Sequence, residues 1–243
     1  MHGSIPMIQP DQRVRILRNQ ARPQNGVMLF LDAWGRDAGR IEFKNAHAAS
    51  PCFTPGTMIA TQRGEVAVER LDVGDRIITR DNGLQVIRWL GKRAVHTDFL
   101  PANAHLCPVR IARGALGNDL PEREMVVSPN HRILVSNDKT ALHFDAAEVL
   151  VSAKHLTGLP GVERVKGITT HYLHLMFERH EVILSDGVWS ESFRPDVRTV
   201  VGIGNAQRIE LLELFPELAT KEGLEGYAPA RHSLTSREAA LIK

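Results

Sequence analysis

The chain has 243 residues, of which 43% are hydrophobic and 24% charged, values typical of a globular protein with one sizeable core. The formal net charge of +2, the scattered Lys and Arg residues and an aromatic content of 5% argue against a nucleic-acid-binding surface. No run approaches about eighteen apolar residues, so no membrane span is expected.

The first fifty residues are predicted to form an upstream flanking segment. They lack a basic stretch followed by an apolar one, so a conventional signal peptide is not expected. We therefore expect a soluble chain that is cytoplasmic as synthesised, with unconventional export left open. Apolar residues at 27–31 and 41–43, with a turn between them, predict a short hairpin.

From residue 51 onward, short β-type runs alternate with turn signals such as Asp81-Asn82-Gly83, where Asn-Gly tolerates the positive φ of a tight turn. Regular short strands of this kind predict an all-β fold. The expected strands are residues 57–61, 65–68, 76–80, 84–89, 109–111, 125–127, 132–135, 172–177, 181–184 and 188–190.

The remaining segments are predicted to be loops and short helices. An inserted loop is expected over about 97–121, and short helices over 145–150 and 208–214. The last twenty or so residues are expected to be a loosely attached tail with a final helical turn at 236–241.

Two cysteines, Cys52 and Cys107, lie far apart without a CxxC pair, so neither a disulfide framework nor a structural zinc site is expected. A lone cysteine such as Cys52 is most often a small buried hydrophobe. A histidine in a turn, as in Ser128-Pro129-Asn130-His131, is more often a hydrogen-bonded surface group. Neither motif indicates a function by itself.

Taken together and in order, four motifs resemble those of the Hint superfamily of inteins and hedgehog C-terminal domains. The likeness is closest to bacterial hedgehog/intein-like proteins and covers about residues 51–193, leaving 194–243 as a C-terminal extension. It implies a Hint-type horseshoe β-fold with short helices. The motifs are Cys52-x-x-Pro55-Gly56-Thr57, Val73-Gly74-Asp75-Arg76, Ser128-x-x-His131, and His180 followed by Asp186-Gly187-Val188.

The resemblance also implies a reaction. In Hint domains the first cysteine directly follows the scissile bond, and its thiolate attacks the preceding carbonyl. Here that bond joins Pro51 to Cys52, and the attack is an N–S acyl shift that gives a thioester. The substrate is the chain's own upstream segment, the acceptor is water or another small nucleophile, and no metal or organic cofactor is needed.

Further roles are carried over by the same resemblance. His131 would give a proton to the amine of Cys52, since the pKa of histidine lies near neutrality. Ser128, where many relatives have threonine, would hydrogen-bond the scissile amide or the oxyanion. His180 would assist the second step, and His174 is a neighbour on the same predicted strand.

Three features depart from the family pattern. Inteins end in His-Asn, whereas the corresponding positions hold Glu191 and Ser192, so cleavage without full splicing is expected. Hedgehog domains use an acidic residue in sterol transfer, for which Asp98 and Asp119 are only guesses. The ring of Pro51 crowds the carbonyl that would be attacked.

Three alternatives to self-processing remain open. The chain could be a catalytically silent Hint-fold structural or delivery module. It could also be a Cys–His hydrolase that acts on separate substrates, or it could hold a metal between histidines, although no familiar ligand spacing supports that.

Overall fold

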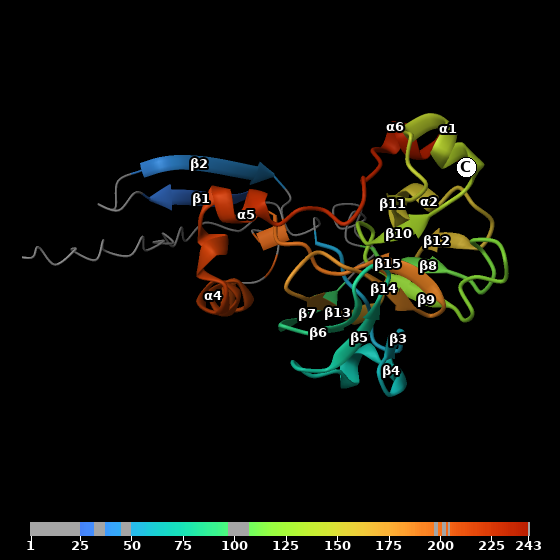
Figure 1. Cartoon of the computed structure of the whole chain (residues 1–243), viewed down its shortest axis with the longest axis horizontal. Helices are drawn as coiled ribbons and strands as arrows, with labels where there is room; N and C mark the ends of the chain where they lie inside the picture. Colours follow the sequence, from blue (N-terminus) through green and yellow to red (C-terminus); the bar gives the residue numbers. More distant parts are fainter. Residues whose placement is uncertain are drawn as a thin grey trace, which may run out of the picture.

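The computed structural model describes residues 25–31, 37–44, 50–96, 107–196, 199–200, 203 and 205–242. Short β-strands dominate this part of the chain, and the helices between and after them are short (Figure 1). The predicted all-β fold class is therefore confirmed.

The largest sheet has eight antiparallel strands, with residues from both ends of the domain side by side. Within this sheet, the hairpin of residues 182–191 lies against strands from the start of the domain. Ser185 pairs with Ile59, and Ile183 pairs with Thr79. In order, the strands are β11 (Val149–Ser152), β10 (Arg132–Val135), β15 (Val188–Glu191), β14 (Val182–Ser185), β3 (Met58–Thr61), β5 (Arg76–Thr79) and β6 (Gly83–Val86), and β4 (Gly64–Ala67) pairs with β3.

Smaller sheets complete the fold. β1 (Asn25–Leu31) and β2 (Asp37–Lys44) form the hairpin predicted in the upstream segment. The others are β12 (Val162–Arg164), β8 (Val109–Ile111) and β9 (Met125–Val127) in one sheet, and β13 (Thr169–Met176) with β7 (Trp89–His96) in another.

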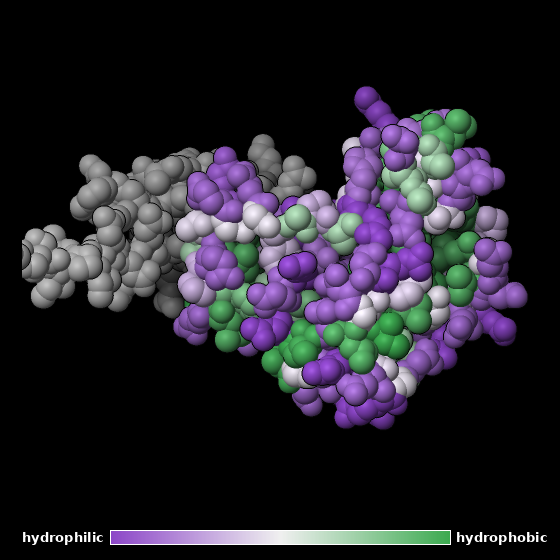
Figure 2. Space-filling model, in the orientation of Figure 1, coloured by the Kyte–Doolittle hydropathy of each residue, from purple (hydrophilic) through white to green (hydrophobic). Residues whose placement is uncertain are grey.

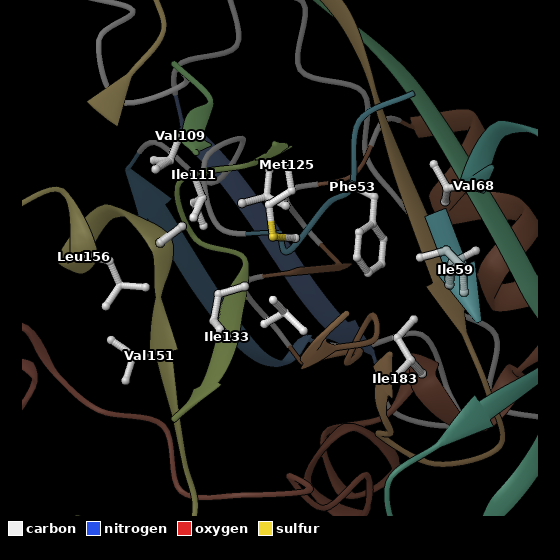
Figure 3. Packing of buried hydrophobic residues seen from close by; sticks show 14 of the residues in the cluster. Phe53, Ile59, Val68, Val109, Ile111, Met125, Ile133, Val151, Leu156 and Ile183 are labelled. Atoms are coloured by element: carbon white, nitrogen blue, oxygen red, sulfur yellow. The ribbon is translucent and has the colours of Figure 1, made fainter. Parts of the chain in front are cut away.

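Phe53 connects two of these sheets, because it makes an antiparallel bridge to Val127 of β9 and another to Leu173 of β13. Its ring lies among the buried side chains of the main core, near Met125 and Ile59 (Figure 3). Since Phe53 directly follows Cys52, its burial holds that cysteine inside the domain.

One helix was predicted in the wrong place. Residues 145–150 are not helical; the helix α1 (Asp138–Phe144) comes just before them, and β11 follows. Asn137 and Thr140 form a capping box that starts α1 early, and Asp145 at φ 48° ends it in the left-handed conformation. The other predicted helices are confirmed within α4 (Asn205–Leu214) and α6 (Ser236–Ala239).

The C-terminal residues are packed, contrary to the predicted loose tail. Leu234, Ala239 and Ile242 belong to the main core, and Ser233 makes a parallel bridge to Leu150. A second core gathers around Trp89 and residues of α4 and α5 (Lys221–Gly226). Polar residues cover most of the face in Figure 2, with smaller apolar areas between them. The remaining short helices are η2 (Val68–Arg70), α2 (Ala153–Leu156) and η4 (Pro216–Ala219).

Candidate active site

The backbone of Cys52 is fixed from two sides by residues distant in the sequence. The next residue, Phe53, exchanges two hydrogen bonds of 2.9 Å with Leu173 of β13. On the other side, the N–H of Ser128 donates to the carbonyl oxygen of Cys52 at 3.0 Å. These bonds place the Pro51–Cys52 peptide in the interior between β9 and β13.

Ser128 also binds this segment through its side chain. Its Oγ accepts a hydrogen bond from the N–H of Cys52 at 3.0 Å and donates one to the carbonyl oxygen of Ser50 at 3.0 Å. Both of its hydrogen bonds are made inside the protein, because the side chain is buried. The hydroxyl therefore spans Pro51 and contacts the nitrogen that would become the leaving amine.

The Cys52 thiol is buried and protonated in this arrangement. Its Sγ donates to the carbonyl oxygen of Ser50 at 3.3 Å. Burial raises the pKa of Cys52 well above its ordinary value, although Ser128 and Arg93 act in the opposite direction. A thiol in this state needs a nearby base before it can act as a nucleophile.

His174 of β13 contacts both the Cys52 thiol and the carbonyl oxygen of Pro51. Its Nδ1 lies 2.9 Å from the carbonyl oxygen of Pro51, and its Nε2 lies 3.7 Å from Cys52 Sγ. Burial lowers the pKa of His174 to about 4, against a smaller opposing effect of the hydrogen bond to Pro51. The ring is therefore neutral near pH 7.

His131 lies in the same interior but makes no hydrogen bond through its ring among the described residues. The ring packs edge-on against Phe53 with centroids 4.4 Å apart, and its exposed fraction is 0%. Burial lowers the pKa of His131 to about 4, partly offset by Glu191. An unpartnered buried imidazole is costly for stability, which is typical of a functional group.

His180 belongs to a neighbouring polar cluster. Its Nδ1 accepts a hydrogen bond of 3.0 Å from the N–H of Ala230, so its Nε2 carries the proton and faces Glu191 Oε2 at 3.5 Å. Glu191 also accepts from the backbone N–H and the guanidinium of Arg132, at 2.9 and 2.7 Å. Burial alone would raise the pKa of Glu191, but Arg132 and His180 together hold it below its ordinary value.

The structure thus joins Cys52 by direct contacts to Ser128 and His174, whereas His131 touches the neighbouring Phe53 and His180 faces Glu191. From the sequence, His174 was expected only as a neighbour of His180. No local signal marks it, because the pairing of Leu173 with Phe53 that brings it to Cys52 is a long-range contact.

The two acidic guesses gain no support. Asp119 lies in an exposed turn at φ 58°, and Asp98 is outside the described residues. Both cysteines are buried, and neither forms a disulfide. Among the described residues there is no cluster of three or more His, Cys, Asp or Glu side chains that could hold a metal ion. No helix in the same part of the chain is both long and apolar enough to cross a membrane.

The family model of the Hint domain matches residues 51–197, more than half of the chain. The chain belongs to the Hint domain family. The family assignment predicted from the four motifs is therefore confirmed. No curated protein matches the chain.

Solved structures of Hint-type domains are similar in a more distant way. The bacterial intein-like domain from Clostridium thermocellum is 12% identical, with a TM-score of 0.39, and the match covers 58% of this chain and 97% of that one. The gp41-1 intein is 10% identical, with a TM-score of 0.36, and the match covers 58% of this chain and 97% of that one. A DnaB intein from Synechocystis sp. is 11% identical, with a TM-score of 0.33, and the match covers 59% of this chain and 99% of that one.

Proposed function

We propose that this Hint domain cleaves its own chain between Pro51 and Cys52 through an N–S acyl shift. The observation that carries the proposal is a pair of hydrogen bonds at Ser128 Oγ, which accepts from the Cys52 N–H and donates to the Ser50 carbonyl oxygen. They hold the buried scissile segment on both sides of Pro51. In this proposal the clamp places a hydroxyl on the nitrogen that must leave.

In this proposal Cys52 is the nucleophile and the Pro51 carbonyl carbon is the electrophile. Ser128 binds the nitrogen that leaves, and His131 delivers the proton that this nitrogen needs. The support for His131 is its complete burial with two unpartnered ring nitrogens beside Phe53. Water or another small nucleophile then resolves the thioester, without a metal or an organic cofactor.

His180 is kept as a candidate for assisting this second step. Its support is indirect, because its protonated Nε2 faces Glu191 rather than Cys52. Its Nδ1 is occupied by the N–H of Ala230 in the C-terminal extension.

We further propose that the C-terminal flank stays attached. Glu191, at the position of the intein histidine, is engaged in a buried ion pair with Arg132. Ser192, at the position of the cyclising asparagine, accepts a hydrogen bond from the N–H of Glu181 at 2.9 Å and cannot form a succinimide. The C-terminal flank therefore cannot be released by cyclisation at position 192, because no asparagine side chain is present there.

A purified full chain treated with hydroxylamine or a small thiol is expected to release a fragment ending at Pro51. A thioester reacts with these nucleophiles far faster than an amide does, so only a chain that forms it should respond. Mass spectrometry should find one other product, running from Cys52 to Lys243. Cys52→Ala should abolish the release, whereas Cys107→Ala, at the other buried cysteine, should cleave like the parent.

Two outcomes would contradict this proposal. Cleavage of Cys52→Ala at the parent rate would exclude Cys52 as the nucleophile. A ligated product that joins residues before Cys52 to residues after Ser192 would demonstrate splicing. A silent Hint-fold module is the second candidate, favoured by the raised pKa of the Cys52 thiol, and a parent chain that stays intact under every nucleophile would establish it.

A further inference from the structure

One imidazole, that of His174, reaches both atoms that must change during the acyl shift. Its Nδ1 lies 2.9 Å from the carbonyl oxygen of Pro51, where negative charge develops. Its Nε2 lies 3.7 Å from Cys52 Sγ, which must lose a proton.

The carbonyl oxygen fixes which ring nitrogen of His174 carries the hydrogen. A carbonyl oxygen can only accept a hydrogen bond, so Nδ1 must be the donor. In the neutral ring the lone pair is then on Nε2, the nitrogen that faces the thiol. The tautomer imposed by Pro51 therefore directs a proton acceptor at Cys52.

The surrounding residues hold the ring in this position. Trp89 stacks on it with an interplanar angle of 16°, and Phe193 packs against it edge-on with centroids 5.1 Å apart. Gly91, which pairs with His174 across the sheet, leaves the room that this requires. A Cβ at position 91 would overlap the Trp89 ring and come within 3.0 Å of His174 Cδ2.

We propose that His174 is a catalytic residue of this site, as the base for the Cys52 thiol through Nε2 and as the oxyanion donor for Pro51 through Nδ1–H. This inference rests on the proposed function, because it concerns the same acyl shift. It assigns to one side chain two tasks that the family resemblance did not give to it.

The proposed step balances as follows. Nε2 takes the thiol proton, Sγ bonds to the Pro51 carbonyl carbon, and the carbonyl electron pair moves to the oxygen held by Nδ1–H. When the carbonyl reforms, the bond to the Cys52 nitrogen breaks and this nitrogen takes up one proton. Neutral His131 can release one proton and accept another, so it can pass on the proton from His174 and the shift consumes none.

Charged and titratable groups around His174 favour its neutral form at rest. Arg93 of β7 lowers its pKa, and His131 and His174 interact with each other electrostatically. The Cys52 thiol also faces the ring, with Sγ 3.7 Å from Nε2. A neutral imidazole is the form that can accept the thiol proton.

The test compares His174→Gln, His174→Ala and the control His171→Gln, a histidine on the same strand, by their thiol-induced cleavage rates across pH. Glutamine can still donate to the Pro51 oxygen but cannot act as a base. His174→Gln is expected to lower the rate at pH 7 by about 10²–10⁴-fold, with the loss shrinking as pH rises and hydroxide replaces the base. His174→Ala should lose more, and His171→Gln should match the parent.

A His174→Gln rate within about threefold of the parent, with the same pH profile, would overturn this inference while leaving the proposed function intact. A parent that never cleaves would instead reject the proposed function. A measurement independent of cleavage uses nitrogen NMR of the uncleaved Cys52→Ala chain, with the His174 signals assigned by their loss in Cys52→Ala/His174→Gln. A protonated Nδ1 and a bare Nε2 support the inference, and the opposite tautomer overturns it.

Discussion

At the scale of single residues, Ser128 links two buried backbone groups on either side of Pro51. Its hydroxyl accepts from the Cys52 nitrogen and donates to the Ser50 carbonyl oxygen. Removing one partner from a buried polar pair costs about 1–3 kcal/mol, more than the net gain from forming an average hydrogen bond. The same hydroxyl therefore supports both the local fold and the proposed leaving group.

Ser128→Ala is expected to lower the cleavage rate by about 10²-fold or more and the free energy of unfolding by about 1–3 kcal/mol. Ser128→Thr keeps the hydroxyl and should retain most of the cleavage. Cleavage is followed by mass spectrometry, and stability by urea unfolding in the Cys52→Ala background. Equal rates for the alanine and threonine variants would show that the hydroxyl has no part in the reaction.

Residue identities were more predictable than their contacts. Cys52, Ser128 and His131 lie in two of the four short motifs that, taken together and in order, predicted the family correctly. The contact of His174 with Cys52 depends on a strand pairing across about 120 residues, which no local pattern encodes. The same holds for His180, whose partner Ala230 belongs to the C-terminal extension.

At the scale of elements, local signals predicted most strands correctly but misplaced the helix that precedes β11. The helix predicted at 145–150 was wrong because the capping box of Asn137 and Thr140 starts the helix earlier. Val149 and Leu150, which were predicted to be helical, belong to a buried strand. β-branched and apolar residues that are buried on both faces favour a strand. Burial on both faces is a property of the whole sheet and is not visible in the segment itself.

The link between β10 and β15 gives a prediction at this scale. Glu191 of β15 is fully buried and holds both the backbone and the guanidinium of Arg132, which is about a quarter exposed. Glu191→Gln leaves this guanidinium without its charge partner, so the free energy of unfolding should fall by about 2 kcal/mol. Urea unfolding in the Cys52→Ala background measures the change.

A matched control is Glu163→Gln, which breaks one of the two solvent-exposed ion pairs of Arg110. Screening by water leaves such a pair with little effect on stability, so no measurable change is expected. If both variants lose the same free energy of unfolding, burial does not explain the contribution of the Glu191–Arg132 pair to stability.

At the scale of the whole molecule, the fold buries two neutral histidines, His174 against Pro51 and Cys52 and His131 against Phe53. Burial lowers the pKa of both His131 and His174 to about 4, whereas an unfolded chain has histidines with a pKa of about 6.5. Between these values the unfolded state binds more protons than the folded state. Stability is then fully present above about pH 6.5 and is lost as the pH falls toward 4.

Other buried groups change this dependence only in part. Burial raises the pKa of Glu181 and of Asp186, and such carboxyls favour the folded state as pH falls. The histidine shifts are the larger ones, so the net stability should fall between pH 7 and pH 5, by on the order of 2 kcal/mol for each histidine. Urea unfolding of the Cys52→Ala chain at the two pH values measures this loss.

Removing one of the two histidines tests the cause of this pH dependence. In the Cys52→Ala background, His174→Gln replaces a group that must stay neutral with one that cannot titrate, so the loss between pH 7 and pH 5 should shrink by about half. His171→Gln, whose histidine is only partly buried on the same strand, should leave the loss unchanged. If the His174→Gln chain loses as much stability as its background, proton binding at His174 does not drive the acid sensitivity. The stability data would then give no support for the neutral His174 ring that the proposed base requires.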